Sequence, residues 1–396
     1  MSHKILHTSD WHLGKKLFKR SRLEEQKLFL NWLRETISSE SVDFLIIAGD
    51  IFDTPTPPND ALELYFDFLE TVSNTTNVHI IIISGNHDSA NFIQAPGKIL
   101  ARHNIHIKTR LDVNLENNII SIIKDDVEFL FKCLPYFRSY ELYQFIEENR
   151  DITPADIEKI LKDFSHYWPK PNTSKQYKTL IGHHAFGDFS ATGSEHIVSV
   201  MGIESLSLNW FSQFDYMALG HIHKTQKMSK TQNIYYCGSP IPLRFSEQQS
   251  KNVLLVNTEN KEVQKLEIPV FREIIQLNSD ESSIMADLKA TISSIQAPFE
   301  LEAFIEIKLQ MNKANTELID DIYNLAQLSG HQILSLIPIF SENNLDRENF
   351  SGVNDLSISD LFEMYYKEKY PDTEEIPVEI KDEFNLLLEE INSEIP

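Results

Sequence analysis

The stretch Val78-His79-Ile80-Ile81-Ile82-Ile83-Ser84-Gly85-Asn86-His87-Asp88 decides the fold of this 396-residue chain. Its four consecutive isoleucines are β-branched and apolar, which is typical of a strand buried on both faces of a parallel sheet. Ser84-Gly85 then predicts a tight turn. Asn86 and His87 therefore follow the carboxyl end of a buried strand, the edge at which open α/β sheets bind ligands. We expect this amide oxygen and imidazole to bind a metal ion or a phosphate group.

Four other apolar runs end in the same kind of polar cluster. Asp10 and His12 follow the run Lys4–Thr8, and their side chains point the same way in an extended segment because they are two residues apart. The other clusters, each after its own apolar run, are Gly49-Asp50-Ile51-Phe52-Asp53, Gly182-His183-His184 and Gly220-His221-Ile222-His223. Five strand ends therefore offer carboxylate, amide and imidazole groups.

These groups are the ligands that a pair of divalent cations requires. Two ions a few ångströms apart need a shared anionic ligand, and Asp50 suits that role because a carboxylate can give one oxygen to each ion. The other predicted ligands are Asp10, His12 and His223 for one ion and Asn86, His183 and His221 for the other. His87 is left as a proton donor or transition-state contact. Ligand type alone does not choose between Mn²⁺, Fe²⁺ and Zn²⁺.

A single Asp or His at a strand end is usually an ordinary turn residue, so the metal interpretation depends on the five clusters together. His183 is preferred to His184 because it directly follows Gly182 at the strand end, although the sequence leaves a ligand role for His184 open. Histidines outside the clusters, such as His7 and His79, are expected to be structural or solvated.

Helical and strand patterns alternate over the first 85 residues. Helical spacing of apolar residues predicts helices at Leu23–Ser38 and Asn59–Val72, which implies a parallel sheet with crossover helices. A hairpin is predicted over Ile119–Leu134, and helices are predicted at Tyr140–Asn149 and Pro154–Phe164. We therefore predict an α/β fold over residues 1–270, in which two sheets form a sandwich flanked by helices.

The pattern changes after Pro269. Residues 271–340 are predicted to form a small α+β domain, with strands at Phe271–Leu277, Ala303–Leu309 and Gln332–Pro338 and helices at Ser283–Ser294 and Thr316–Leu328. Residues 341–396 are predicted to be a linker followed by two helical segments, Ser357–Lys369 and Val378–Ile391. Their apolar residues favour docking to another protein, and packing against their own chain is the alternative.

Composition and charge narrow the function classes. The chain is 41% hydrophobic, as in ordinary globular proteins, and no apolar run approaches the roughly 18 residues of a membrane span. Met1–Lys4 leads directly into a strand without a signal-peptide pattern, so we expect a cytoplasmic protein with no membrane association. Cys133 and Cys237 lie in strand-like runs and are expected to be reduced core thiols.

The net charge of −23 argues against a generic nucleic-acid binder. The acidic tail accounts for part of it, because residues 353–396 hold 13 Asp or Glu and 3 Lys. A basic stretch follows the first cluster and contains Lys15, Lys16, Lys19, Arg20 and Arg22. We hypothesise that these bases contact a phosphate backbone, and a solvated loop is the alternative.

The five clusters resemble the motifs of calcineurin-like metallophosphoesterases. Within that superfamily, three further stretches are similar to pieces of the SbcD family, the nuclease subunits of bacterial SbcC-SbcD complexes: Thr8-Ser9-Asp10-Trp11-His12-Leu13-Gly14, Leu134-Pro135-Tyr136 and Gly238-Ser239-Pro240-Ile241-Pro242-Leu243. The resemblance covers residues 1 to about 270 well and is looser beyond them.

The resemblance implies a nuclease with two Mn²⁺ ions that works in DNA repair and recombination. It would act as an exonuclease on double-stranded DNA ends and as an endonuclease on hairpins and single strands. His87 would assist departure of the leaving oxygen, residues 271–340 would cap the DNA, and residues 341–396 would bind an SbcC-type coiled-coil ATPase. A homodimer within a heterotetramer is expected, with residues 59–72 and 90–103 as candidates for the two-fold contact.

Two other functions remain open from the sequence. A phosphatase or nucleotidase of the same superfamily would share the metal centre. Protein phosphatases of this class continue the second motif as Gly-Asp-x-x-Asp-Arg-Gly, however, whereas Thr54-Pro55 follows Asp53 here. A non-catalytic subunit that only scaffolds an ATPase through its acidic helices is the second alternative, and the complete ligand set argues against it.

Overall fold

The computed structural model describes residues 2–146, 150–195, 203, 205–247, 250–296, 298–312 and 315–340, together with residues 362, 366, 376, 377, 380, 381 and 384. The chain forms two compact units. The first contains Met1–Gln310 and Asn315–Pro338, and the second contains Met311–Ala314 and Ile339–Pro396.

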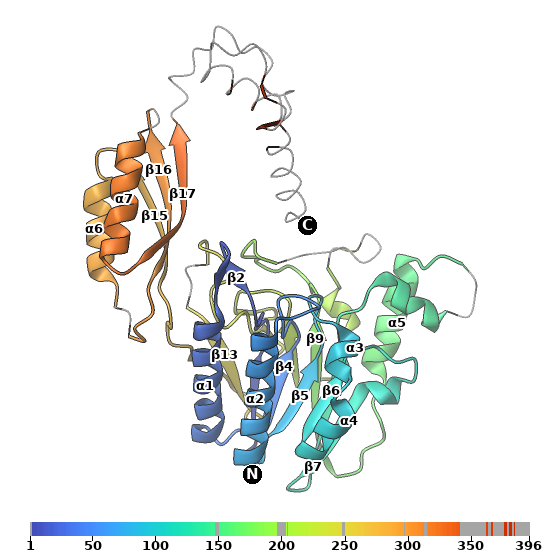
Figure 1. Cartoon of the computed structure of the whole chain (residues 1–396). Helices are drawn as coiled ribbons and strands as arrows, with labels where there is room; N and C mark the ends of the chain where they lie inside the picture. The colour runs from blue at the N-terminus through green and yellow to red at the C-terminus, as the bar shows by residue number, and fades with distance from the viewer. Residues whose placement is uncertain are drawn as a thin grey trace. The chain divides into compact units, whose positions relative to one another are not determined.

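The first unit contains two six-stranded sheets (Figure 1). Across the first sheet the strands are β14 (Val263–Glu267), β13 (Asn252–Asn257), β1 (Lys4–Thr8), β4 (Phe44–Ala48), β5 (His79–Ile83) and β6 (Ile105–Lys108). β1, β4, β5 and β6 run parallel, while β13 pairs antiparallel with β1 and with β14. The predicted parallel sheet is therefore confirmed.

The second sheet is also parallel at its centre. Its strands in order are β11 (Gln226–Lys227), β12 (Ile234–Tyr236), β10 (Tyr216–Gly220), β9 (Lys175–His183), β8 (Val127–Leu134) and β7 (Ile119–Lys124). β8, β9, β10 and β12 are parallel, and β7 and β11 pair antiparallel at the edges. β7 and β8 form the predicted hairpin.

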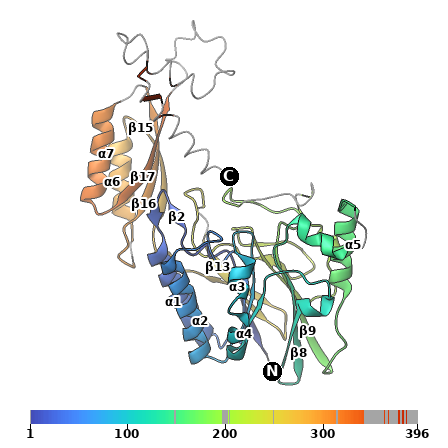
Figure 2. The same ribbon diagram turned by 45° about the vertical axis from the view of Figure 1, so that its right-hand side comes forward.

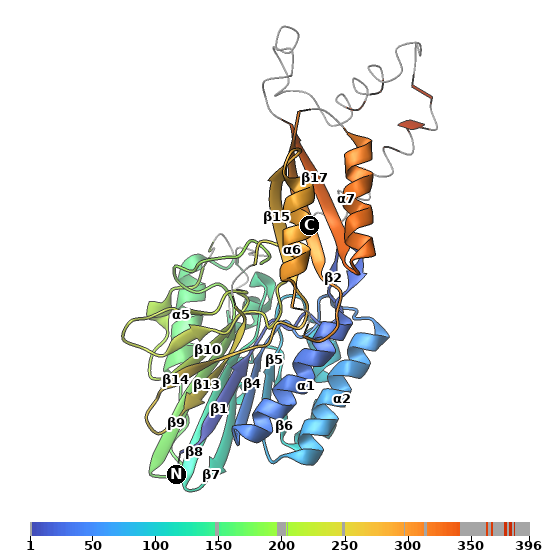
Figure 3. The same ribbon diagram turned by 90° about the vertical axis from the view of Figure 1, so that its left-hand side faces the viewer.

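The isoleucine run of β5 explains how the layers stack. Ile81 and Ile83 lie in the core between the two sheets, whereas Ile80 and Ile82 lie in the core beneath the helices α1 (Leu23–Ser39) and α2 (Asn59–Thr75). α5 (Pro154–His166) covers the outer face of the second sheet. Figures 2 and 3 show α1 and α2 on one side of the sheets and α5 on the other. The predicted two-sheet sandwich flanked by helices is confirmed.

Short elements complete this part of the chain. They are the hairpin strands β2 (Lys16–Leu17) and β3 (Arg20–Ser21), the helices α3 (Ala90–Gln94) and α4 (Gly97–Leu100), and the 3₁₀ helices η1 (Ala101–His103), η2 (Leu115–Asn118), η3 (Ser139–Phe145) and η4 (Leu208–Trp210). The helix predicted at Tyr140–Asn149 was wrong in type. Its described part is the 3₁₀ helix η3, and residues 147–149 lie outside the described residues.

The strands and helices predicted after Pro269 are confirmed. They are β15 (Ile274–Asp280), α6 (Ile284–Ser294), β16 (Phe304–Met311), α7 (Thr316–Leu328) and β17 (Gln332–Phe340), and the sheet order is β15-β16-β17. α6 and α7 cover one face of this sheet (Figure 1), and Ile305 and Ile307 of its central strand are buried. The domain boundaries themselves stay a prediction.

Most of the two predicted tail helices lies outside the described residues. Among the few that are described, the ring of Phe362 stacks on that of Phe384 with centroids 3.8 Å apart. Cys133 and Cys237 are buried free thiols, as expected. Throughout the described part of the chain, no helix combines the length and apolar character needed to cross a membrane.

Candidate metal centre

The five polar clusters meet at the carboxyl ends of the central strands. The first sheet supplies Asp10 and His12 after β1, Asp50 after β4, and Asn86 and His87 after β5. The second sheet supplies His183 at the end of β9, and His221 and His223 after β10. Because both sheets present this end of their strands to the same point, side chains as distant in sequence as Asp10 and His221 become neighbours.

The backbone around the ligand candidates adopts sparsely populated conformations. Asp10, His12, Asp50 and His221 all have positive φ angles, of 54°, 46°, 49° and 94°. Residues other than glycine rarely adopt this region, and such outliers gather at functional sites where the surrounding structure enforces them. Here the backbone N–H of Asp10 donates to Gly49 O at 3.0 Å, which ties the first two clusters together.

Two glycines allow the clusters to approach this closely. A Cβ atom on Gly85 would lie 2.1 Å from Asp50 Oδ1, and one on Gly220 would lie 2.0 Å from Ala48 O. Both distances are far shorter than van der Waals contact. Glycine is therefore required at both positions, since any side chain would displace the carboxylate of Asp50 or the loop after β10.

Asp10, His12 and His223 form one group of ligand atoms. One ligand atom from each lies within 4.8 Å of the others, and all three side chains are buried. His12 Nε2 lies 3.3 Å from His223 Nε2, and His223 Nε2 lies 4.0 Å from Asp10 Oδ1. This is the set of residues that the sequence predicts for the first ion.

Asp50, His183 and His221 form a second group, with Asn86 beside it. Asn86 Oδ1 lies 3.2 Å from His183 Nε2 and 2.8 Å from His221 Nδ1. Asp50 Oδ2 lies 3.3 Å from His183 Nε2 and 3.6 Å from His12 Nε2 of the first group. One oxygen of Asp50, Oδ2, thus faces both groups, whereas the sequence analysis expected one oxygen for each ion.

His87 lies against both groups. Its backbone N–H donates to Asp50 Oδ1 at 2.9 Å, so the other oxygen of that carboxylate is held by the chain. Its Nδ1 lies 2.8 Å from Asp53 O, and its ring meets the ring of His12 edge-on at 4.8 Å. The imidazole predicted to act in catalysis therefore stands next to the candidate bridge.

Opposite charges and burial shift the pKa values in this cluster in different directions. Burial alone would raise the pKa of Asp50, but the imidazoles of His183 and His12 hold it well below its usual value. Burial raises the pKa of Asp10 to about 6. Burial would lower the pKa of His183, but Asp50 raises it to about 9. A cation that binds here must displace the proton from His183.

The donor set fits divalent cations. Buried carboxylate, amide and imidazole atoms crowd around one point, and the two Nε2 atoms of His12 and His223 face each other at 3.3 Å. Such a concentration of acceptors is costly without a proton or a cation between them. His183 and Asp50 would link the second sheet to the first through the same ions.

His184 has a different environment from His183. It is buried between aromatic rings, with its ring centroid 4.2 Å from that of Phe137 and 5.0 Å from that of Tyr136. Its Nε2 accepts the backbone N–H of Phe137 at 3.3 Å. The geometry therefore favours His183 over His184 as the ligand from this strand end.

The basic stretch after the first cluster divides into exposed and engaged side chains. Lys16, Lys19 and Arg20 are exposed on the β2–β3 hairpin, whereas Lys15 Nζ lies 3.1 Å from Asp53 Oδ1. The prediction that Arg22 contacts DNA requires correction. Arg22 is completely buried, with its guanidinium bound to the Glu25 carboxylate and to Pro242 O, and it is not available to a phosphate.

Several supporting residues escaped the sequence interpretation. Asp53 Oδ1 lies 3.3 Å from His12 Nδ1, and Asp88 accepts the backbone N–H groups of Ile51, Phe52 and Gly85 at 3.2, 3.0 and 2.8 Å. Both lie inside the motifs quoted in the sequence analysis, so their supporting roles could have been predicted from their positions. Ser194, which approaches His223, and Glu247, which accepts from Ser194, lie in no motif that the sequence analysis recognised.

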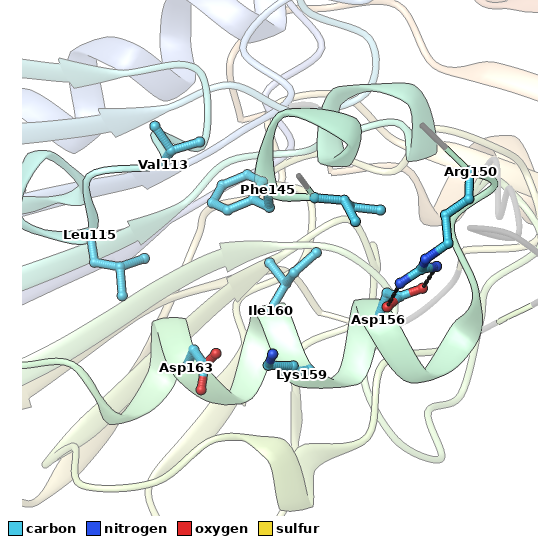
Figure 4. A pocket seen from close by; sticks show the side chains of 9 residues that line it. Val113, Leu115, Phe145, Arg150, Asp156, Lys159, Ile160 and Asp163 are labelled. Atoms are coloured by element: carbon cyan, nitrogen blue, oxygen red, sulfur yellow. Dashed lines mark hydrogen bonds and ion pairs between the residues drawn. The ribbon is translucent and has the colours of Figure 1, made fainter. Parts of the chain in front are cut away.

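A cavity of about 560 Å³ lies apart from these ligand atoms (Figure 4). Val113, Leu115, Phe145 and Ile160 supply apolar lining, and Arg150 forms an ion pair with Asp156 at 2.7 Å. None of its lining residues belongs to the five polar clusters. The cavity is therefore separate from the candidate metal centre and does not add residues to it.

Comparisons with known proteins agree with this geometry. Residues 3–225 match the calcineurin-like phosphoesterase family. The chain is 31% identical over 314 residues to the D subunit of nuclease SbcCD from Escherichia coli (strain K12), covering 74% of this chain and 76% of that protein. It is 27% identical over 386 residues to the corresponding protein of Bacillus subtilis (strain 168), covering 92% of this chain and 93% of that protein.

A crystal structure of a dimetal phosphatase from Danio rerio is matched over 67% of this chain and 99% of that one, at 12% identity and a TM-score of 0.36, which is too low to bear on the fold. The family match spans more than half of the chain and includes the five polar clusters, whose side chains meet in space. The chain belongs to the calcineurin-like phosphoesterases and, within them, to the SbcD family of SbcCD nuclease subunits.

Proposed function

We propose that this chain is a metal-dependent DNA nuclease that works with an SbcC-type ATPase in DNA repair and recombination. The observation that carries the proposal is the convergence of seven candidate ligands, with His87 beside them, at one point between two sheets. The identity to named SbcD proteins supports the nuclease activity and the ATPase partner. Its substrates would be double-stranded DNA ends, hairpins and single strands.

The proposed ligands are Asp10, His12, Asp50, Asn86, His183, His221 and His223. When bound, two divalent cations supply a nucleophile at neutral pH and neutralise charge on the scissile phosphate. We propose Mn²⁺ for both sites, on the strength of the family resemblance. The protein's part is to hold the ligands in place through its strained strand-end backbone and to exclude competing side chains with Gly85 and Gly220.

His87 would donate a proton to the leaving oxygen. Burial lowers the pKa of His87, so its protonated imidazole is a stronger acid than a solvated one. The carbonyl of Asp53 accepts from Nδ1 and fixes the ring, which leaves a proton on Nε2 as the one that can be transferred. Asp50 supports the charged form through its negative charge, which keeps the proton within reach.

DNA would be held by positive charge next to the centre. Lys16, Lys19 and Arg20 are exposed on a hairpin that directly follows the first cluster, and Lys15 lies between that hairpin and Asp53. An acidic protein needs such a local basic surface to attract a phosphate backbone. We propose phosphate contacts for these four bases and exclude Arg22.

The other parts of the chain are assigned by family resemblance. We propose that residues 271–340 cap the DNA and that residues 341–396 bind the coiled coil of the ATPase. A homodimer within a heterotetramer is supported by exposed apolar side chains on the helices expected to make the two-fold contact, Phe66 on α2, Phe92 on α3 and Ile99 on α4. A cytoplasmic location stays a prediction.

The test uses the purified full-length chain with Mn²⁺ and two substrates, a hairpin DNA and a small phosphomonoester. We expect cleavage of the hairpin and little turnover of the monoester. His87→Ala should lower DNA cleavage by about 10²–10⁴-fold while the bound metal content stays the same. Asp50→Ala should lose metal from both sites, as measured by elemental analysis.

His166→Ala is the matched control, because His166 is an exposed histidine outside the cluster and outside the proposed two-fold contact. It should cleave DNA at the wild-type rate. Turnover of the monoester with no DNA cleavage would instead identify a phosphatase. If neither substrate were hydrolysed, the result would favour a non-catalytic subunit that only scaffolds the ATPase. Wild-type cleavage by His87→Ala would remove His87 from the mechanism.

A further inference from the structure

We infer that Ser194 is a positioning residue for the first metal site, and that it acts by fixing which nitrogen of His223 carries the proton. The inference rests on the proposed function, because it assigns His223 as a metal ligand. Ser194 lies in the loop between β9 and β10, in no motif of the family resemblance. Its hydroxyl lies 2.5 Å from His223 Nδ1 and 2.6 Å from Glu247 Oε1.

Every polar atom of His223 except Nε2, which lies 3.3 Å from His12 Nε2, contacts a residue outside the ligand cluster. Its backbone N–H donates to Glu195 Oε1 at 3.0 Å, and its carbonyl accepts from Lys251 Nζ at 3.3 Å and from the backbone N–H of Ser239 at 3.2 Å. Nδ1 faces the hydroxyl of Ser194. Only Nε2 points to the other ligand candidates, so the residue is held in one orientation toward the cluster.

The direction of the hydrogen bonds follows from the charge on Glu247. Glu247 is buried and forms an ion pair with Lys251, so it is a carboxylate and can only accept hydrogen bonds. Ser194 must therefore donate its hydroxyl hydrogen to Glu247. The lone pairs of its oxygen then face His223, and Nδ1 of His223 must carry the proton. Nε2 is left with a lone pair, the form that a metal ion requires.

Hydrogen bonds to the Glu195 carboxylate join the loop that carries Ser194 to the backbone of His223. Glu195 accepts the backbone N–H of Thr192 and that of Gly193 at 2.9 Å, as well as that of His223. Thr192 Oγ1 also reaches Glu247 at 3.3 Å. Thr192–Glu195 therefore forms a compact turn closed by one carboxylate, which sets the hydroxyl of Ser194 over the imidazole.

A comparable arrangement holds the other imidazole of the first group. His12 Nδ1 lies 3.3 Å from the carboxylate of Asp53, while its Nε2 faces His223 and Asp50. Both imidazoles thus have an oxygen near Nδ1 and turn Nε2 toward the same point. The difference is that His223 Nδ1 meets the Ser194 hydroxyl at 2.5 Å, whereas His12 Nδ1 lies near a carboxylate oxygen without forming a hydrogen bond to it.

The experiment measures Mn²⁺ binding to the metal-free full-length chain by titration calorimetry. Ser194→Ala removes the acceptor at Nδ1, and we expect about 10–100-fold weaker binding at one site with the other site unchanged. Ser194→Thr keeps the hydroxyl and should bind like the wild type. Ser190→Ala is the matched control from the same loop, since the contacts of Ser190 with Gln226 run through its backbone atoms.

A second readout reports the proton directly. Nitrogen-15 spectra of labelled histidine in the metal-free protein should show His223 with its proton on Nδ1 in the wild type, and a mixture of tautomers in Ser194→Ala. Equal affinities of wild type and Ser194→Ala at both sites would overturn the inference, and so would an unchanged tautomer. A merely structural serine would alter thermal stability without weakening one site.

Failure of this inference can be told apart from failure of the proposed function. DNA cleavage is assayed separately, at saturating Mn²⁺. A wild-type chain that binds two Mn²⁺ but cuts no DNA contradicts the nuclease proposal, while the contrast between Ser194→Ala and Ser190→Ala still decides the role of Ser194. A cleaving wild type with no such contrast contradicts the role of Ser194 alone.

Discussion

Buried histidines in this molecule respond to protons in opposite ways. His183 faces the Asp50 carboxylate, which raises its pKa to about 9 against the effect of burial. His7 lies in the core, where burial and not a carboxylate sets its charge state. Burial lowers the pKa of His7 to about 3, and Nδ1 meets the hydroxyl of Tyr216 at 2.9 Å. His7 is therefore neutral in the folded chain under all ordinary conditions.

This gives a pH prediction for the metal-free protein. Between pH 6.5 and about 3 the unfolded chain protonates His7 and the folded chain does not, so folding loses stability as the pH falls. The contribution of His7 is about 1.4 kcal/mol per pH unit in that window. His7→Leu should flatten the acid side of the stability curve by that slope, measured by urea unfolding at a series of pH values.

His7→Leu also loses the hydrogen bond to Tyr216, which should lower the free energy of unfolding by the same amount at every pH. That loss shifts the whole curve and does not change its slope against pH. His103→Leu serves as the control, because His103 is exposed. An acid slope in His7→Leu equal to that of the wild type would show that His7 is protonated in the folded state.

Among single residues, the sequence predicted the positions of those that lie in short motifs directly after apolar runs. Asp50, Asn86 and His87 follow glycines directly after apolar runs, so their common position could be predicted. The role of Arg22 could not, because an arginine in a basic stretch looks the same whether its partner is a phosphate or the buried Glu25. Ser194 and Glu247 are 53 positions apart and meet only in the folded chain.

The β2–β3 hairpin is the element that carries the exposed bases. Its turn residues Phe18 and Lys19 both have positive φ angles, 47° and 66°, in a turn where Asn-Gly is the usual choice. Leu17 anchors the hairpin in a small core with Phe245, Ile274 and Phe304. The hairpin is therefore fixed at its base, with its basic side chains in solvent.

Replacing Lys16, Lys19 and Arg20 by Gln should weaken DNA binding in a salt-dependent way. If each base contacts one phosphate, the slope of log affinity against log salt should become shallower by about 2–3 for duplex DNA. Fluorescence anisotropy with a short duplex at several salt concentrations measures this slope.

The matched control neutralises three other exposed lysines, Lys170, Lys175 and Lys265. Lys175 begins β9, so it lies at the end of the strand opposite to His183. This variant should keep the wild-type slope although it loses the same charge. Equal slopes for both triple variants would mean that the hairpin makes no particular phosphate contact.

Helices and strands with a long, regular pattern of apolar residues could be predicted from the sequence. The type of a short helix could not. The two crossover helices and the β7–β8 hairpin show long, regular apolar patterns. Residues 139–145 have helical spacing as well, yet they form a 3₁₀ helix. A segment of this length makes too few backbone hydrogen bonds for its own pattern to decide between the two helix types, so packing decides.

At the scale of the whole first unit, Arg272 joins segments that are far apart in the chain. It is 4% exposed, and it donates to Glu25 Oε1 at 2.9 Å, to Glu24 Oε2 at 3.1 Å and to Glu302 O at 2.7 Å. Its guanidinium also lies over the ring of Phe304, 4.2 Å from the centroid. α1, the residues before β15 and those before β16 are thus held by one side chain.

Arg272→Met should therefore destabilise the chain. Met retains most of the apolar contact with Phe304 but none of the hydrogen bonds, and bonds to charged groups contribute about 1.5–3 kcal/mol. We expect a loss of that order in the free energy of unfolding, measured in urea. Arg110→Met, at an exposed arginine outside the proposed two-fold contact, should be unchanged. Equal stability of the two variants would show that the Arg272 contacts contribute nothing net.

The order of the layers in the molecule could be predicted from the sequence. The hydrogen bonds and ion pairs that join distant segments could not. Five apolar runs with interleaved helices leave few arrangements other than a parallel sandwich. Arg272, by contrast, follows Phe271 in a stretch that reads as the start of a strand. Its partners Glu24, Glu25 and Glu302 depend on where three distant segments meet.

The split of the ligand candidates between the two sheets has a consequence for protein synthesis. His12 and His223 are 211 positions apart and belong to different sheets. A chain that is still on the ribosome holds only Asp10, His12, Asp50 and Asn86 until nearly half of its length has emerged. On the proposed ligand set, a half-made copy lacks His183, His221 and His223, so we expect it to hold neither metal ion and not to cut DNA.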